Sequence, residues 1–407
     1  MLAAWASLFA LGLVDNARGP IFPDILKDFG LSDTKGSFFF FAASLASLTH
    51  NLIFHRFLSH ARPVRLVGVY TLIMGAGAAL MSLAQTYELI LTAASLFGVG
   101  VGGLGVGMNA AVQAAPAAYR GRALGILHSM YGVSSLLAPL IVSEFVSSGW
   151  RNVLLALSAP SFLVGAVVLY RSIISPVESL KPARGLPQSR IVKPALEILD
   201  APDSPAKSPK VWTTQQQRAT WFAAALVALL VIAEISISSR LVLLARRDWG
   251  ISAESVGHWL AAYFAAMTFS RLALGLFKFR LSPRRILFFA MGFGFPFLLF
   301  AFLPLGLPSE IRLTALIGFG IPIAMGYPLA MTRFAEVFEG RTQAVTSLCL
   351  IFQSAGAMAM HFTLGWGADI YGLPLILGVV SCGALLGAFV SFWAMERAVL
   401  RGESAIP

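Results

Sequence analysis

Long apolar runs, separated by short polar or charged stretches, follow one another along almost the whole chain. A helix that spans a membrane needs about 20 predominantly apolar residues. On this rule we predict twelve transmembrane helices and therefore an all-α membrane protein. The predicted helices cover residues 2–27, 35–57, 63–84, 88–115, 121–146, 150–174, 218–245, 252–279, 283–305, 309–338, 341–370 and 373–400.

One long polar segment interrupts this series. Residues 175–217 contain seven prolines among many polar residues, a composition typical of an extended linker and unsuited to a membrane helix. We therefore predict an N-terminal six-helix bundle at residues 1–174, a cytoplasmic linker at 175–217 and a C-terminal six-helix bundle at 218–407.

Lysine and arginine are concentrated in the linker and in the loops after the second, fourth and eighth predicted helices. Cytoplasmic loops of membrane proteins carry such an excess of cations. We therefore predict a multi-pass protein of the cell (inner) membrane with both termini in the cytoplasm. Arg246 and Arg247 depart from this pattern on the opposite side, where Asp248 and Glu254 offset their charge.

The composition agrees with a chain that is surrounded by a lipid bilayer. Hydrophobic residues make up 57% of the sequence and charged residues only 12%, whereas soluble domains carry about 25% charged residues. This leaves too little polar surface for a soluble protein. The net charge of +11 lies largely in the loops that set orientation, so it does not indicate a nucleic-acid partner.

Nothing in the sequence favours an enzyme, a cofactor or a metal site. Cys349 and Cys382 both lie in apolar runs, which does not indicate a disulfide framework or a metal site. The glycine-rich run at residues 98–107 follows no predicted strand, so it is a poor match for a dinucleotide-binding loop. Its small residues favour close packing between helices.

The two halves share related motifs at equivalent places. Residues 51–59 (NLIFHRFLS) run from the end of the second predicted helix into the loop after it, and residues 275–285 (GLFKFRLSPRR) do the same at the eighth. A Gly-Arg pair opens both the fifth and the eleventh helix, at residues 121–122 and 340–341. A diverged six-plus-six repeat is typical of transporters whose site lies near the middle of the membrane between the halves.

On these motifs the chain resembles the major facilitator superfamily over nearly its whole length. The signature of that family, Gly-x-x-x-Asp-Arg-x-Gly-Arg-Arg, is degenerate here. Asn51 and His55 replace the glycine and the acid of the first copy, and Phe279 replaces the acid of the second. The resemblance implies two six-helix bundles and alternating access, whereas the missing acids leave the family's usual loop gating without its acidic partner.

Further stretches resemble the fucose/glucose–proton symporter branch, at residues 19–23 (GPIFP), 120–128 (RGRALGILH), 131–139 (YGVSSLLAP) and 270–275 (SRLALG). This resemblance implies a sugar or another small polar solute moved with a proton or a sodium ion. It also implies a coupling carboxylate in the first or fourth helix. Because Asn109 stands in the fourth helix where an acid is expected, this role moves to Asp15 or Glu234.

A charged pair lies in the middle of the first predicted helix. Arg18 follows Asp15 by three residues, so the two side chains share a helix face and can form an ion pair. Ionisable groups at this depth are functional by default, and we predict that the pair couples to the ion, with Asn16 as a candidate substrate ligand. The structural alternative is an ion pair that locks the helix to a neighbour. We also expect Gly19 and Pro20 to break this helix.

Glu234 lies in the seventh predicted helix, the repeat equivalent of the helix that carries Asp15. We predict that it is a second coupling carboxylate facing the same cavity, with Ser238 on its helix face as a substrate ligand. Arg271 is a candidate partner of Glu234 and a candidate substrate ligand. The alternative is a neutral acid hydrogen-bonded between helices. We expect Arg240 to extend toward the outer interface.

The remaining candidate substrate ligands are amides, which offer both donors and acceptors to a hydroxyl-rich solute. They are Asn109, Gln113 and Gln353. Each has the alternative role of holding helices together.

These observations predict a secondary transporter that functions as a monomer, with a small polar solute such as a sugar as its substrate and a proton or sodium ion as its partner. Two other substrate classes stay open: amphipathic or lipid-like compounds moved by efflux, and organic anions or metal ions recognised by the buried charges. A membrane receptor that does not transport is the alternative from another class.

Overall fold

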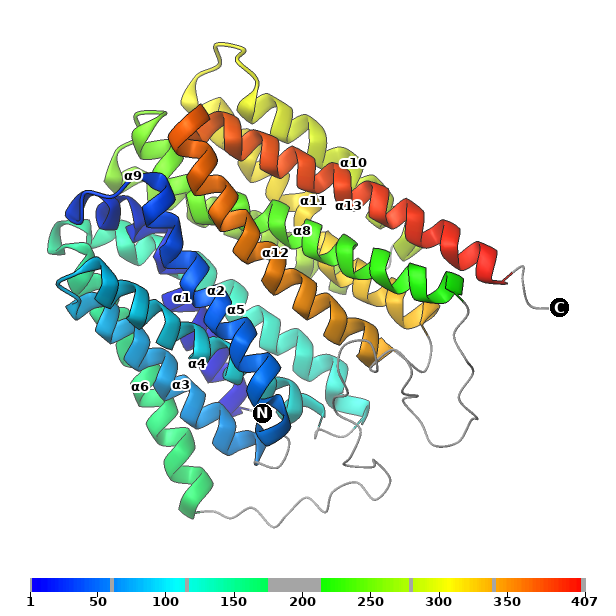
Figure 1. The fold of residues 1–407 in the computed structure, drawn as a ribbon, viewed down its shortest axis with the longest axis horizontal. Coiled ribbons are helices and arrows are strands. Elements are labelled where there is room, and N and C mark those ends of the chain that lie inside the picture. The colour runs from blue at the N-terminus through cyan, green and yellow to red at the C-terminus, as the bar shows by residue number, and fades with distance from the viewer. Residues whose placement is uncertain are drawn as a thin grey trace. The chain divides into compact units, whose positions relative to one another are not determined.

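The computed structural model describes residues 2–58, 62–113, 117–174, 214–277, 281–338 and 342–403 (Figure 1). Within the helices, the description leaves out the side chains of residues 54–58, 109–110, 112–113, 117–125, 128, 275, 342–344, 347 and 402–403.

The described residues form twelve α-helices and one short 3-10 helix, which confirms the predicted all-α class. The first group is α1 (Leu2–Asp28), α2 (Asp33–Leu58), α3 (Pro63–Leu83), α4 (Tyr87–Gln113), α5 (Ala117–Glu144), η1 (Val146–Ser148) and α6 (Trp150–Ile174). The second group is α8 (Thr214–Arg247), α9 (Ala253–Leu276), α10 (Pro283–Phe302), α11 (Ser309–Val337), α12 (Thr342–Tyr371) and α13 (Leu373–Glu403).

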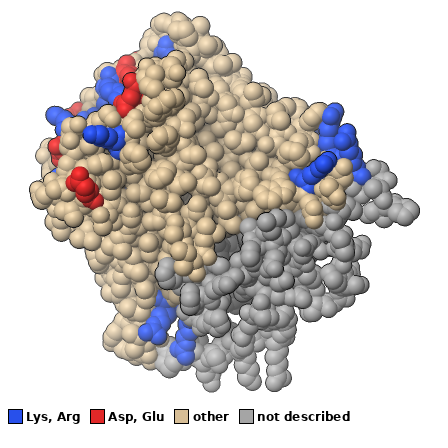
Figure 2. Space-filling model, in the orientation of Figure 1, with Lys and Arg blue, Asp and Glu red and all other residues tan. Residues whose placement is uncertain are grey.

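Apolar length predicts these helices well because a chain in lipid must satisfy its backbone hydrogen bonds within each segment. Nine of the twelve helices are long and apolar enough to cross a membrane by length and composition alone, among the residues searched. The other three are α1, α5 and α9. On the face drawn in Figure 2, the charged side chains lie in a few separate clusters, and most of the other described surface there is uncharged.

The first of two compact units contains Met1–Gly185, Ser238–Ala265 and His361–Leu373. In it α3 packs against α4 and α6, α2 packs against α4, and α1 packs against α5 and α6. The glycine-rich run of α4 allows a close approach to α2. A Cβ atom added to Gly98 would lie 2.1 Å from the carbonyl oxygen of Ala43 in α2, so only glycine fits there. The run therefore serves helix packing.

This unit joins segments that lie far apart in the chain. The end of α8, the start of α9 and the end of α12 belong to it together with α1–α6. The Ser143 hydroxyl of α5 donates to the Ala253 carbonyl of α9 (3.2 Å), and Gly365 of α12 lies against Ser37 of α2. The division into bundles on either side of residues 175–217 follows chain order and stays a prediction.

The second unit contains Leu186–Ile237, Ala266–Met360 and Pro374–Pro407. In it α10 packs against α11. Glu396 of α13 is 4% exposed and forms ion pairs with Arg333 of α11 (2.7 Å) and Arg284 of α10 (3.0 Å). One carboxylate thus holds three helices together.

The predicted break in the first helix is wrong. Helix α1 runs without interruption from Leu2 to Asp28 through Pro20 and Pro23. Neighbouring helices hold it, since Ile21 and Phe22 are fully buried and Gly19 lies against the Ser238 carbonyl of α8. Close packing lets membrane helices tolerate proline, which a rule based on local sequence does not take into account.

Candidate functional site

The charged pair of α1 forms as predicted. Arg18 donates to Oδ1 of Asp15, and the Tyr131 hydroxyl of α5 donates to Oδ2 of the same carboxylate (2.8 Å). The two charged side chains are 14% and 25% exposed. Asp15 therefore accepts from two donors inside a largely buried environment.

Arg18 also contacts aromatic rings. Its guanidinium carbon lies 4.7 Å from the ring centre of Phe97 and 5.5 Å from that of Phe40. The buried Nε atom of Arg18 has no hydrogen-bond partner among the described residues. Part of the hydrogen-bonding capacity of this guanidinium is therefore unused.

Asn16 turns toward α5. Its side-chain nitrogen donates to the Gly12 carbonyl and to the Ser135 hydroxyl, both at 2.9 Å. Both amide hydrogens are therefore used within the protein. A role of Asn16 as a substrate ligand stays a prediction, and only its side-chain oxygen is left to serve it.

The expected extension of Arg240 to the outer interface is wrong. Arg240 of α8 is only 2% exposed. Its Nη2 atom donates to the Ser37 hydroxyl of α2 (2.7 Å), and its guanidinium carbon lies 4.3 Å and 4.9 Å from the ring centres of Phe22 and Phe40. Aromatic faces and one hydroxyl thus hold this cation inside the protein, and these contacts come from distant parts of the sequence.

His361 of α12 joins the same aromatic cluster. Its ring stacks on Phe40 with the centroids 4.8 Å apart, and the side chain is 4% exposed. The sequence marks His361 only as a polar residue within a predicted span. Its proximity to two arginines depends on the packing of three helices, so no local pattern indicates it.

In the second unit, Glu234 and Arg271 form the predicted pair. Nη2 of Arg271 lies 3.2 Å and 3.1 Å from the two carboxylate oxygens of Glu234. The Nε atom of the same arginine donates to the Ala324 carbonyl (3.2 Å). Arg271 is 36% exposed and Glu234 23%, so the arginine of this pair is more accessible than Arg18, whereas the two carboxylates are similarly exposed. A cavity shared by Asp15 and Glu234 stays a prediction.

Of the four remaining predicted ligands, two can be placed and two cannot. Ser238 is partly buried in α8. The buried Oε1 atom of Gln353 in α12 has no hydrogen-bond partner among the described residues, and its role as a ligand stays a prediction. The side chains of Asn109 and Gln113 lie outside the described residues.

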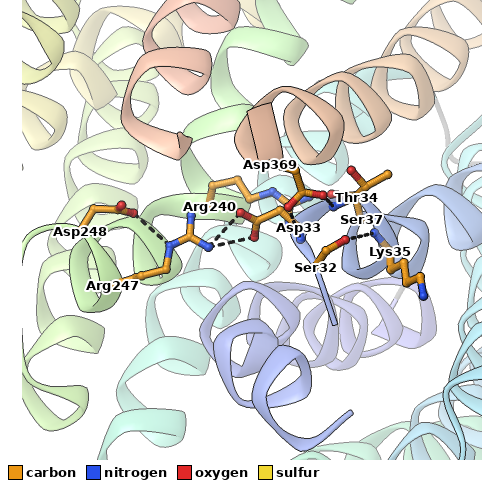
Figure 3. A network of polar contacts seen from close by, with 9 residues as sticks. All are labelled: Ser32, Asp33, Thr34, Lys35, Ser37, Arg240, Arg247, Asp248 and Asp369. Carbon is orange, nitrogen blue, oxygen red and sulfur yellow. Dashed lines mark hydrogen bonds and ion pairs between the residues drawn. The ribbon is translucent and has the colours of Figure 1, made fainter. Parts of the chain in front are cut away.

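A polar network that the sequence analysis missed lies at one end of the first unit (Figure 3). Nη1 of Arg247 lies 2.8 Å and 3.0 Å from the carboxylate oxygens of Asp33. Asp369 of α12 accepts from the backbone amides of Asp33 and Thr34 at the start of α2, both at 2.9 Å. It therefore caps the first turn of α2 although it lies 336 residues from Asp33 in the chain.

Arg246 is paired in the same region. Its two terminal nitrogens lie 3.1 Å and 3.0 Å from the carboxylate oxygens of Asp24 in α1. Burial raises the pKa of Asp248, although the adjacent Arg247 acts in the opposite direction. Arg246 and Arg247 are the cations that depart from the loop-charge pattern, and their ion pairs with α1 and α2 account for that departure. The presence of these two arginines on the side opposite to the cation-rich loops is therefore the feature of the sequence that could have indicated this network.

Among the described residues, no group of three or more His, Cys, Asp or Glu side chains is placed to hold a metal ion. The chemistry of the described interior is thus that of ion pairs, aromatic faces and a few unused polar atoms.

Comparison with known proteins agrees with this architecture. The family model of the Major Facilitator Superfamily matches residues 4–360. Among curated proteins, none matches the chain.

Solved structures of the same fold include a bacterial homologue of the human lysosomal transporter Spinster, captured in an inward-facing and occupied conformation. It has 16% identity and a TM-score of 0.65, covering 99% of this chain and 95% of that chain. Its inward-facing and unoccupied form has 15% identity and a TM-score of 0.66, covering 98% of this chain and 96% of that chain. A D-xylose–proton symporter has 13% identity and a TM-score of 0.71, covering 95% of this chain and 96% of that chain. At these identities the likeness concerns the fold.

Proposed function

The chain belongs to the major facilitator superfamily, and from this membership we propose that it is a secondary active transporter coupled to a proton or sodium gradient. It moves a small polar solute, with a sugar as the first candidate, across the cell (inner) membrane by alternating access. Both termini lie in the cytoplasm and a single chain is sufficient for transport.

The observation that carries this proposal is that two membrane helices, α1 and α8, each contain a carboxylate that is paired with an arginine. Asp15 faces Arg18 in α1, and Glu234 of α8 faces Arg271 of α9. Charges at this depth are costly unless they are paired. A proton that neutralises the carboxylate, or a sodium ion that binds it, competes directly with the arginine for the same oxygens. Ion binding therefore changes how one helix is held against its surroundings.

Glu234 has the simpler set of contacts of the two carboxylates. Asp15 accepts hydrogen bonds from both Arg18 and Tyr131, whereas Glu234 faces one nitrogen of an arginine that is 36% exposed. A coupling ion at Glu234 therefore displaces fewer hydrogen-bond donors than one at Asp15. Coupling by Glu234 and a supporting role for Asp15 follow from this difference.

A D-xylose–proton symporter among the structures of the same fold supports a sugar as the first candidate and a proton as the coupling ion. The buried, unpartnered oxygen of Gln353 supports a solute that donates hydrogen bonds.

Uptake into proteoliposomes tests this function. The purified chain is reconstituted, and accumulation of radiolabelled D-xylose, D-glucose and D-gluconate is followed under an imposed pH or sodium gradient. Glu234→Gln should abolish gradient-driven accumulation yet preserve exchange of solute across the membrane, because exchange needs no net movement of the ion. Glu336→Gln is the matched control, since Glu336 is 46% exposed in its ion pair with Arg333.

Three outcomes would contradict the proposal. The first outcome is that neither gradient drives flux of any solute that stabilises the protein. The second is that the control Glu336→Gln loses accumulation as severely as Glu234→Gln. The third outcome is that Asp15→Asn and Glu234→Gln both accumulate solute at the wild-type rate, which removes the coupling role from these carboxylates.

A further inference from the structure

Three nitrogen-bearing side chains from three helices surround the ring of Phe40 in the first unit. Arg18 of α1 and Arg240 of α8 place their guanidinium carbons 5.5 Å and 4.9 Å from its centre. His361 of α12 stacks on the ring at 4.8 Å. The charges of both arginines act on the His361 ring, so the three groups form one cluster.

Each member of this cluster has a buried nitrogen atom with no hydrogen-bond partner among the described residues. These atoms are Nε of Arg18, Nη1 of Arg240 and Nδ1 of His361. Buried polar atoms in folded proteins nearly always have a partner, and those that lack one require an explanation. The two arginine nitrogens are donors, and Nδ1 of histidine is a donor in one tautomer of the neutral ring. Three such atoms around one ring therefore indicate a ligand that accepts hydrogen bonds.

The charge of the cluster points the same way. Arg18 faces the carboxylate of Asp15. Arg240 forms no ion pair with a carboxylate within the described part of the chain, and its hydrogen bond goes to the neutral Ser37 hydroxyl. The nearby Asp33 is already paired with Arg247. A buried cation without a counter-ion is unfavourable, so the cluster lacks one negative charge.

We propose that Arg18, Arg240 and His361 bind the anionic group, a carboxylate or a phosphate, of the transported solute. Arginine is suited to both groups because its planar fork can donate two parallel hydrogen bonds. The rings of Phe22, Phe40 and Phe97 hold the guanidinium groups in place. This inference rests on the proposed function and narrows its solute from a neutral sugar to a sugar acid, a sugar phosphate or another small organic anion.

The opposing explanation is structural, in which Arg240 only locks α8 to α2 through Ser37. The two explanations differ in one measurable respect. If Arg240 is only a structural lock, its substitution lowers the stability of the protein equally with and without ligand. If Arg240 binds the ligand, its substitution also reduces the additional stabilisation that the ligand provides.

Equilibrium binding to the full-length protein in detergent tests the proposal. Succinate, D-gluconate and D-glucose 6-phosphate are the anionic probes, and 1,4-butanediol and D-glucose are their neutral analogues. Thermal stabilisation and calorimetric titration give the dissociation constants. We expect at least one anion to bind and its neutral analogue to bind far more weakly, and the succinate and phosphate arms distinguish the two kinds of anionic group.

Variants then locate the site. Loss of one charged hydrogen-bonding group weakens binding by about 10- to 100-fold, so we expect this loss in Arg240→Gln and a smaller one in Arg240→Lys. The surface variant Arg397→Gln is the matched control, because Arg397 is exposed and lies over Trp393. Should Arg240→Gln not fold, His361→Gln keeps the test open, since it retains the hydrogen bond between Arg240 and Ser37, and weaker anion binding is again expected.

The proposal is overturned if no anion binds, if the neutral analogues bind as tightly, or if a folded Arg240→Gln or His361→Gln protein binds the anion like the wild type. Its failure is distinct from failure of the proposed function. Gradient-driven uptake of a neutral sugar alone refutes only the anion site, whereas anion binding without any gradient-driven flux refutes only the transport function.

Discussion

The cap that Asp369 provides to α2 can be tested by graded substitution. Its two carboxylate oxygens each accept one backbone amide at 2.9 Å, from Asp33 and Thr34. Asp369→Asn retains one acceptor and loses the negative charge that the N-terminus of a helix favours. Asp369→Ala loses both acceptors as well as the charge. The two variants should therefore weaken the first turn of α2 to different degrees.

The magnitude follows from the exposed position of Asp369. Removal of a capping side chain costs about 0.5–2 kcal/mol, and the charge at an exposed helix N-terminus contributes about 0.3–1 kcal/mol. We expect a loss of about 1–2 kcal/mol for Asp369→Ala and about half of this for Asp369→Asn. A loss of this size changes a local opening equilibrium by a factor of about 5–30.

Amide hydrogen exchange measures this opening directly, because the protection of an amide reports the free energy of the local opening that exposes it. Peptides that cover the first turn of α2 should exchange most slowly in the wild type, faster in Asp369→Asn and fastest in Asp369→Ala. Glu310→Ala is the control, since Glu310 is an exposed acid in the first turn of another helix, α11. Equal exchange at α2 in wild type and Asp369→Ala would refute the capping argument.

The remaining predictions concern helix packing and a buried carboxylate. Gly98→Ala should lower the melting temperature, because overpacking costs about 1–3 kcal/mol, whereas Gly105→Ala has open space around its Cβ and should raise it slightly. An unchanged melting temperature for Gly98→Ala contradicts the close approach of α4. Glu396→Gln leaves two arginines without their shared carboxylate and should cost about 3 kcal/mol by thermal unfolding. Glu336→Gln should cost less than about 1 kcal/mol. Equal losses of stability in Glu396→Gln and Glu336→Gln would refute the distinction between the buried and the exposed carboxylate.

The helices could be predicted from the sequence because each is a long apolar run with polar ends. α6 has the predicted bounds, Trp150–Ile174, and the other helices differ by a few residues at their ends. The ion pair between Asp15 and Arg18 followed from their spacing on one helix. These features depend on local sequence alone, which is why they could be recognised without the structure.

The rest of the site depends on contacts between distant segments. Arg240 lies near the end of its predicted span, where an extended arginine is the usual arrangement. Only the packing of α1 and α2 shows that it is enclosed by Phe22, Phe40 and Ser37. The pair between Asp33 and Arg247 joins residues that are 214 positions apart. No periodicity or spacing rule in one sequence relates residues at such separations.

The two prolines of α1 give this helix an uneven stiffness. Because proline has no N–H group, Pro20 and Pro23 donate no hydrogen bond to the carbonyls four residues before them, those of Asn16 and Gly19. The helix is unbroken, yet it resists bending least in this short stretch. Arg18 lies within it and Asp15 lies just before it. A bend of α1 in this stretch would therefore alter the separation of the charged pair, and loss of the charge on Asp15 would remove one restraint on such a bend.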